Sequence, residues 1–235
     1  MTLRLGLPSK GRLMTDCFDW FGARGLTLRK AGADREYRAE AVGADGLGVD
    51  RLEVVLLAAS EIARELAAGR LHLGVTGSDL VREGVPGWDR TLRVLVPMGF
   101  GAADLVIAVP QGWVDVDRLD DLDAVAAAFR RAHGFRLRIA TKYHRLTREF
   151  LQAHGVADYQ LIDSQGATEA AVKAETAEAV SDITSTGETL RANGLKVLAD
   201  GLIHASQATL YKSRLAPWGT DAQAALRQVE DILGL

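Results

Sequence analysis

The chain has 235 residues, of which 48% are hydrophobic and 25% are charged. This composition is typical of a globular protein and excludes a disordered chain, and the length suffices for one large α/β domain or two lobes of roughly one hundred residues each. The 28 basic and 31 acidic residues give a net charge of -3, which provides no global attraction for nucleic acid. Cys17 is the single cysteine, so a disulfide scaffold is excluded, and we expect a buried thiol in a reducing compartment.

The N-terminal sequence resembles no export signal, because charges at Arg4 and Lys10 interrupt any apolar stretch. No window approaches the roughly 18 uncharged apolar residues that a membrane span requires. We therefore predict a soluble cytoplasmic protein with neither a membrane nor a nucleic-acid partner.

Short apolar runs alternate with segments of helical periodicity along nearly the whole chain, which predicts an α/β protein with largely parallel sheets. In the first half we expect strands at residues 3–7, 26–30, 36–42, 52–57, 72–75, 93–96 and 104–109. The last two are apolar runs typical of strands buried on both faces. Helices are expected from Leu13 to a cap at Gly25, from an N-cap at Ser60 to Gly69, and after Ser78 or Asp79.

In the second half, residues 111–121 read as a loop, and a helix over residues 122–132 ends at Gly134. Further helices are expected at 146–153, 168–174 and from Ala222 to Leu233, with strands at 137–140, 159–162, 177–183, 195–198 and 208–211. Glycines at residues 99, 101 and 201 are candidate crossings between lobes. We therefore predict a discontinuous first lobe, residues 1–98 with 200–235, around a central lobe of residues 99–199.

The hexapeptide Thr184-Ser-Thr-Gly-Glu-Thr189 lies between a predicted strand and a helix, an arrangement that suits a phosphate group. The first N–H groups of a helix lack internal partners and attract anions. Further contacts would come from Ser185, Thr186, Gly187 and Thr189. Asp182, near the end of the strand, is positioned to accept hydrogen bonds from sugar hydroxyls. A strand-to-helix turn without a ligand explains the hexapeptide equally well.

Two cations, Lys10 and Arg12, follow the first predicted strand in a tight loop. Taken alone they read as solvated charges, but beside a phosphate loop they become candidates for a diphosphate group. Residues 76–79 repeat the pattern of strand, glycine, hydroxyl and helix, for which capping is an equal explanation. We pair Glu169 with Asp182 around a ribose, although an acidic residue in a first helical turn is also favourable for dipole reasons.

Several other site classes lack their sequence patterns. The histidines show no metal-ligand spacing: they are His72, His133, His144, His154 and His204. The chain contains neither a Gly-x-Ser-x-Gly elbow nor a Gly-x-x-x-x-Gly-Lys-Ser/Thr loop. A structural zinc site, an α/β-hydrolase and a P-loop NTPase are therefore disfavoured.

A family resemblance emerges from these residues. The signature of the ATP phosphoribosyltransferases, which open histidine biosynthesis, is similar to the pattern formed by Glu169, Ala177, Val180, Asp182, Ile183, Thr186, Gly187, Thr189 and Leu190. Residues 7–12, 74–79, 140–143 and 166–169 also resemble family stretches in the same order. The chain departs from the family pattern at Glu175, where the family has glycine, and near Ala58, where it commonly has arginine.

The resemblance implies two lobes like those of type II periplasmic binding proteins, with a ligand cleft between them. It also implies transfer of a phosphoribosyl group from 5-phosphoribosyl 1-diphosphate to N1 of ATP, with release of diphosphate that carries most of the required Mg²⁺. In this interpretation the 5-phosphate contacts the residues from Ser185 to Thr189 and the ribose contacts Asp182 and Glu169. The diphosphate would contact Lys10 and Arg12, and these two together with Arg35 are the candidates for the role of the missing family arginine.

Because the chain ends after one helix beyond the catalytic part, it resembles the short form without a C-terminal regulatory domain. That form implies a histidyl-tRNA-synthetase-like regulatory subunit and a homodimer within a hetero-oligomer. Two alternatives remain from the residues: a non-catalytic two-lobed sensor of small molecules, and a phosphoribosyltransferase with another acceptor base.

Overall fold

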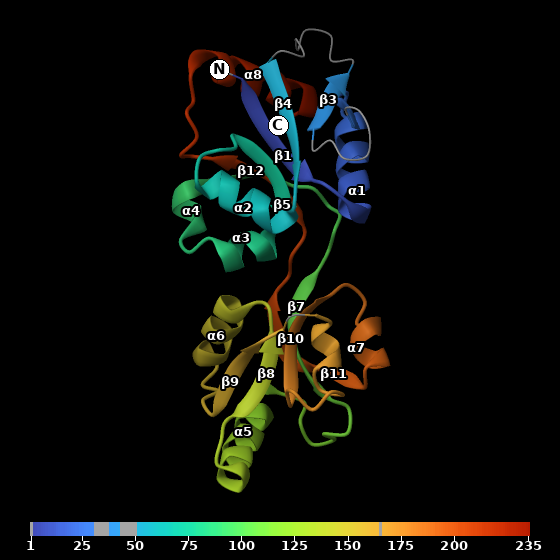
Figure 1. Cartoon of the computed structure of the whole chain (residues 1–235), viewed down its shortest axis with the longest axis vertical. Helices are drawn as coiled ribbons and strands as arrows, with labels where there is room; N and C mark the ends of the chain where they lie inside the picture. Colours follow the sequence, from blue (N-terminus) through green and yellow to red (C-terminus); the bar gives the residue numbers. More distant parts are fainter. Residues whose placement is uncertain (1, 31–37, 43–50, 165) are drawn as a thin grey trace. The chain divides into compact units, whose positions relative to one another are not determined.

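The computed structural model describes residues 2–30, 38–42, 51–164 and 166–235. The chain divides into two units, the first formed by Met1–Gly101 with Gln207–Leu235 and the second by Ala102–Ser206 (Figure 1). These boundaries fall later than the expected crossings at 98/99 and 199/200. The return crossing is later because strand β11 (Leu195–His204) continues well beyond residue 198, where the sequence pattern suggested its end.

The first unit contains a seven-stranded sheet in the order β2-β3-β4-β1-β5-β12-β6. Its strands are β1 (Leu3–Pro8), β2 (Thr27–Lys30), β3 (Arg38–Val42), β4 (Leu52–Leu57), β5 (Leu73–Gly77), β6 (Leu92–Pro97) and β12 (Ala208–Ser213). Only the central pairs β1–β4 and β1–β5 are parallel, so the expectation of a largely parallel sheet is wrong for this unit. Fewer than ten residues connect β2 to β3 and β3 to β4, whereas parallel neighbours need a crossover connection of about a dozen residues or more.

Helices cover both faces of this sheet: α1 (Gly11–Gly22), α2 (Ala59–Ala67), α3 (Ser78–Gly84), α4 (Trp88–Thr91) and α8 (Thr220–Leu233). Alternate residues of β1 bury Leu3, Leu5 and Leu7 in one core cluster with residues of α1 and α8. On the opposite face a Cβ at Gly74 would lie 2.7 Å from Ile62 Cγ2, so α2 can approach the strands closely only because β5 carries a glycine there.

Three helix ends and one strand differ from the sequence predictions. The N-cap residue of α2 is Ala58 rather than Ser60, and the N-cap residue of α3 is Gly77 rather than Ser78 or Asp79. Helix α1 ends at Gly22, with Ala23 rather than Gly25 as its C-cap. β6 is a largely exposed edge strand rather than a buried one, because among the strands that the structure describes only β12 pairs with it. Cys17 is buried as expected, and burial together with the nearby charge of Asp16 raises the pKa of its thiol to about 12.

The second unit contains a five-stranded sheet in the order β11-β7-β10-β8-β9. Besides β11 its elements are β7 (Asp104–Pro110), α5 (Leu119–His133), β8 (Leu137–Thr141), α6 (His144–Ala153), β9 (Tyr159–Asp163), the 3₁₀ turn η2 (Thr168–Ala170), β10 (Ala179–Thr184) and α7 (Glu188–Ala192). β10, β8 and β9 are parallel, as predicted, and β7 is buried as its apolar sequence predicts. β7 itself runs antiparallel to both β10 and β11.

Helix α5 begins inside the segment that the sequence analysis treated as a loop. Asp121 Oδ2 accepts the N–H groups of Asp117 and Arg118, which lowers the pKa of that carboxyl group. Asp200 Oδ1 accepts the N–H of Leu119 from a position distant in sequence. These carboxylates satisfy N–H groups at the helix start and so extend the helix. Its predicted end at Gly134, with φ +76°, is confirmed.

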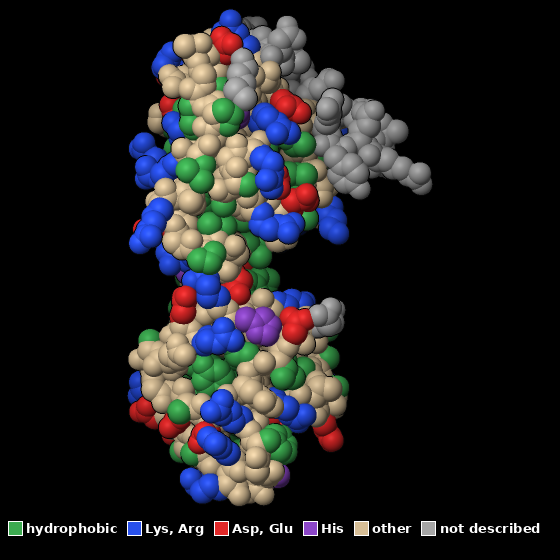
Figure 2. All heavy atoms as spheres, turned by 60° about the vertical axis from the view of Figure 1, so that its left-hand side comes forward, with side chains coloured by type: hydrophobic (Ala, Val, Ile, Leu, Met, Phe, Trp, Pro, Cys, Tyr) green, Lys and Arg blue, Asp and Glu red, His purple; other side chains and the backbone are tan. Residues whose placement is uncertain are grey.

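Charged side chains cover much of the surface, and hydrophobic side chains form separated patches in the space-filling view (Figure 2). Within the described residues, none of the helices combines the length and apolar character needed to cross a lipid bilayer.

Glu175 is the single non-glycine residue with positive φ in the described part of the chain, at +55°. An L-residue in this region is strained by about 1–2 kcal/mol, while glycine is not, although glycine also gains freedom in the unfolded chain. We expect Glu175→Gly to raise the free energy of unfolding by about 0.5–1 kcal/mol in urea denaturation. The matched variant Glu175→Ala keeps the backbone strain, so an equal gain from alanine would contradict this explanation.

Candidate functional site

The turn between β10 and α7 is held in shape by its own hydroxyl groups. The N–H of Gly187 donates to Thr184 Oγ1 at 2.8 Å, and the N–H of Glu188 donates to Thr186 Oγ1 at 3.3 Å. Ser185 Oγ donates to the carbonyl oxygen of Ala102 at 2.8 Å. Gly187 has φ +74° and is the N-cap of α7, so glycine is the residue that this turn requires.

The same turn leaves donors open toward solvent. The N–H groups of Ser185 and Thr186 have no hydrogen-bond partner among the described residues, and the side chains of Thr186 and Thr189 are exposed. Helix α7 has only five residues, so its dipole contributes little, and it begins at Glu188 rather than at Thr189. An anion here would be bound chiefly by these N–H and hydroxyl groups.

Arg191 adds a positive charge that the sequence analysis missed. Its Nη2 donates to the carbonyl oxygen of Thr186 at 3.0 Å, and a Cβ added to Gly187 would lie 2.9 Å from its Nη1. Within the described part of the chain Arg191 makes no ion pair, so its charge remains available to an anion on the turn. Its spacing of four residues from Gly187, about one helical turn, was the available signal.

Asp182 and Glu169, which the sequence analysis paired, are close enough to interact. Burial raises the pKa of Asp182, and the negative charge of Glu169 raises it further. The N–H of Ile183, which donates to Asp182 Oδ1 at 2.9 Å, opposes the shift, as do the Lys142 ammonium and the Thr168 hydroxyl. The like charges destabilise one another in the unliganded protein, and hydrogen-bond donors of a ligand would relieve this cost.

Two further residues at this place were not predicted individually. Lys142, directly after β8, donates to the carbonyl oxygen of Gly166 at 2.7 Å and lies near Asp182. Thr168 is fully buried, and its Oγ1 has no hydrogen-bond partner within 3.5 Å among the described residues, although it is near enough to Asp182 to lower that pKa. Both lay in stretches that matched the family pattern, but residue type alone did not distinguish them.

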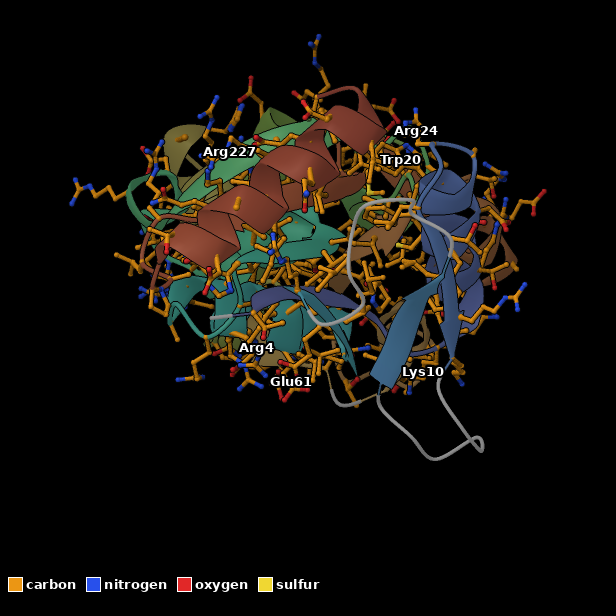
Figure 3. All side chains as sticks on the ribbon, turned by 90° about the horizontal axis from the view of Figure 1, so that it is seen from above. Arg4, Lys10, Trp20, Arg24, Glu61 and Arg227 are labelled. Atoms are coloured by element: carbon orange, nitrogen blue, oxygen red, sulfur yellow. The ribbon has the colours of Figure 1, made fainter. Side chains whose placement is uncertain are left out.

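The predicted cations of the first unit lie in the loop after β1. Lys10 is the N-cap residue of α1 and is exposed at the periphery of this unit (Figure 3). The side chain of Arg12 is 92% exposed and lies 3.6 Å from Asp16 on the same helix, a pair that solvent weakens. Arg35 lies outside the described residues.

The turn after β5 lies at the same edge of this sheet as the loop that contains Lys10, because β1 and β5 are parallel neighbours. Thr76 Oγ1 donates to the carbonyl oxygen of Ala59 at 2.7 Å and thereby joins the end of β5 to the start of α2. The N–H of Ser78 donates to the carbonyl oxygen of Gln207. Thr76 therefore has a clear structural role.

Residues 58–233 match the family model HisG, described as ATP phosphoribosyltransferase. An ATP phosphoribosyltransferase of Cereibacter sphaeroides is 66% identical over 222 residues, which cover 94% of this chain and 92% of the relative. The chain belongs to the ATP phosphoribosyltransferase family. A second member of this family, from Rhodopseudomonas palustris, is 49% identical over 97% of this chain and 68% of its own length.

Solved structures show the same fold. The ATP phosphoribosyl transferase (HisG:HisZ) complex from Thermotoga maritima has a chain that matches with a TM-score of 0.68 at 20% identity, covering 99% of this chain and 98% of that one. A histidine kinase sensor domain similar to periplasmic binding proteins matches with a TM-score of 0.52 at 14% identity, over 99% and 89% of the two chains. The type II periplasmic-binding-protein fold implied by the resemblance is confirmed.

Proposed function

We propose that this ATP phosphoribosyltransferase joins N1 of the adenine of ATP to C1 of 5-phosphoribosyl 1-diphosphate, releasing diphosphate in the first step of histidine biosynthesis, with the 5-phosphate bound by the turn after β10. The observation that carries the residue assignment is the preformed turn with open N–H groups at Ser185 and Thr186 beside the Asp182 carboxylate. Phosphate oxygens are acceptors only, so they match a turn that offers donors.

The ribose contacts Asp182 and Glu169 in this proposal. Departure of diphosphate from the anomeric carbon develops positive charge on the sugar, and neighbouring carboxylates stabilise that charge electrostatically. The ribose hydroxyls would also donate hydrogen bonds to Asp182, whose burial and like-charged neighbour raise its pKa in the free protein. Binding therefore replaces an unfavourable environment of this carboxylate with a favourable one.

The diphosphate contacts Lys10 and Arg12 in this proposal, and these cations would neutralise the charge of the leaving group. Arg35 is proposed as a further diphosphate contact. Mg²⁺, which the family implies, would neutralise diphosphate and be held mainly by its oxygens. The described residues contain no group of three or more His, Cys, Asp and Glu side chains that could hold a metal, but an ion delivered by diphosphate needs only one or two protein carboxylates.

We also propose a regulatory partner, as in the related Thermotoga maritima complex, which contains HisG and HisZ. That partner would resemble histidyl-tRNA synthetase and would join a homodimer of this chain in a cytoplasmic hetero-oligomer. Co-purification of the two chains, followed by mass measurement of the assembly, tests this association.

Incubation with 5-phosphoribosyl 1-diphosphate, Mg²⁺ and either ATP or free bases tests the reaction. We expect a change in the ultraviolet absorbance of adenine when ATP is the acceptor and none when a free base replaces it, because alkylation at N1 changes the conjugation of the ring. The assay is run with this chain alone and with the regulatory subunit of the same organism. A product from a free base but not from ATP would favour the alternative phosphoribosyltransferase, and tight binding without any product would favour the sensor.

Lys10→Ala is expected to lower kcat about tenfold or more, with a smaller effect on the KM for 5-phosphoribosyl 1-diphosphate, because the ammonium group would meet charge that grows as diphosphate departs. Steady-state kinetics with both substrates varied separate the two constants. Lys30→Ala, which removes an exposed lysine from β2 of the same unit, is the matched control. A rise confined to KM would contradict the leaving-group role.

A further inference from the structure

A concave site lies in the first unit, between β6, β12 and α8. It is a cavity of about 520 Å³, a size typical of small-molecule sites. Its lining includes four cationic side chains, Arg93, Lys212, Arg214 and Arg227, but only one carboxylate, that of Glu230. None of the four cations forms an ion pair within the described residues. The cavity therefore carries positive charge that the described part of the protein does not neutralise.

Two of these cations are placed in an unfavourable arrangement by the sheet itself. Lys212 on β12 and Arg93 on β6 are direct cross-strand partners in the antiparallel register. Like charges directly opposite one another destabilise an antiparallel pair. Arg227 of α8 lines the same cavity. A bound anion would convert this repulsion into attraction.

The floor of the cavity is rigid. The buried Ser213 Oγ donates to the carbonyl oxygen of Leu66 at 2.7 Å and accepts the N–H groups of Leu215 and Ala216. Trp218 Nε1 donates to the carbonyl oxygen of Ser213 at 2.9 Å, which holds the indole in place. A ligand that binds here meets a floor that is already positioned, so the ordering that opposes binding is that of the cationic side chains.

This cavity is separate from the loop that contains Lys10. β12 runs antiparallel to β5, with Ala208 opposite Gly77 and Lys212 opposite Leu73. Lys212 is therefore near the start of β5, about 13 Å along the sheet from its carboxyl end, where the Thr76 turn and the Lys10 loop lie. Figure 3 likewise shows Arg227 and Lys10 on different sides of the unit.

We propose that this cavity, which we name the α8 pocket after the helix that carries Arg227, binds a small multivalent anion of the phosphate class, such as inorganic phosphate or diphosphate. Phosphate groups concentrate about -1.5 to -2 charges on a few acceptor oxygens, so they suit a cavity lined by four cationic donors better than a single carboxylate does. The ammonium of Lys212 lies 4.6 Å from the centroid of Trp218 and covers one face of the indole. Charge, rather than stacking of a base, is thus what the α8 pocket offers.

Titration of the full chain with inorganic diphosphate, followed by tryptophan fluorescence, tests this proposal. The expected result is a saturable change that disappears in Trp218→Phe, since Trp218 lines the pocket while the other three tryptophans do not. The double variant Lys212→Gln/Arg227→Gln should weaken binding at least about tenfold. A control with the same charge change outside the pocket, Lys30→Gln/Arg64→Gln, should bind as the original chain does.

Calorimetric titration with diphosphate distinguishes the α8 pocket from any diphosphate site formed by catalytic residues. The pocket variants should lose binding at the α8 pocket and keep binding at the catalytic residues. If the double variant fails to fold, as judged by circular dichroism, the single change at the exposed Arg227 gives the same comparison. Absence of a Trp218-dependent signal with both phosphate and diphosphate would overturn the proposal, as would equal weakening in the control. Equally tight binding of citrate would overturn the assignment to phosphate.

Discussion

Asp182→Asn is expected to stabilise the free protein at neutral pH and at the same time to impair catalysis. The folded protein raises the pKa of Asp182, mainly by burial and then by repulsion from Glu169. A carboxyl group with a raised folded pKa binds its proton more tightly in the native state, so it destabilises the fold progressively as pH rises from the unfolded pKa of about 3.9 through the folded value. Asparagine has no proton to lose and removes this cost.

The effect of Asp182→Asn on the free energy of unfolding is measured by urea denaturation at two pH values, one neutral and one below the pKa of the carboxyl group in the unfolded chain. The variant should unfold at higher urea than the original chain at neutral pH, and the difference should shrink in acid, where both states of Asp182 are protonated. Asp115→Asn, at an exposed carboxylate of the same unit, controls for general loss of negative charge. A stability difference that does not depend on pH would contradict the assignment to ionisation of Asp182.

The catalytic effect of the same substitution should have the opposite sign. A hydrogen bond to a charged group contributes about 1.5–3 kcal/mol, so loss of the carboxylate that we propose as a ribose contact should lower kcat/KM about 10- to 200-fold. Steady-state kinetics with limiting 5-phosphoribosyl 1-diphosphate give this ratio. Unchanged kcat/KM in a folded variant would remove Asp182 from the site.

Gly187→Ala is the second substitution with a large expected effect. At φ +74° an alanine is strained by about 1–2 kcal/mol, and relief of that strain would break the hydrogen bond from the Gly187 N–H to Thr184 Oγ1. The open N–H groups of Ser185 and Thr186 would then point elsewhere. We expect binding of 5-phosphoribosyl 1-diphosphate to weaken about tenfold or more, as measured by calorimetry.

Gly194→Ala provides the matched control for backbone strain. Gly194 has a similar φ of +72°, but it follows the other end of α7, and an added Cβ there would meet open space rather than the flexible end of Arg191. It should therefore lose a similar free energy of unfolding while keeping its affinity for the substrate. Equal loss of affinity in both variants would show that global destabilisation, rather than the shape of the turn, limits binding.

Local features of the candidate site were predictable because they involve neighbours in the chain. The turn from Thr184 to Glu188 is closed by hydrogen bonds among residues at most three positions apart, and Gly187 satisfies its backbone requirement. Most strands and helices were predicted for the same reason. The start of α5 was missed because Asp200, distant in sequence, accepts the N–H of Leu119.

Contacts between distant segments were not predictable in this way. The buried Thr168 hydroxyl and the Lys142 ammonium became part of the candidate site only when β8, η2 and β10 were brought together. Periodicity also could not distinguish parallel from antiparallel neighbours in the first unit, since a strand has the same alternation in both cases.

By itself the sequence determined the α/β class and the resemblance to the ATP phosphoribosyltransferase family, and it predicted the turn after β10, because those properties reside in short-range patterns and in a family signature. Only the tertiary structure decided the environment of Asp182 and the opposition of Arg93 to Lys212. Both depend on packing between segments that are distant in the sequence. Burial raises the pKa of Asp182, and strand register places Arg93 opposite Lys212 in the α8 pocket.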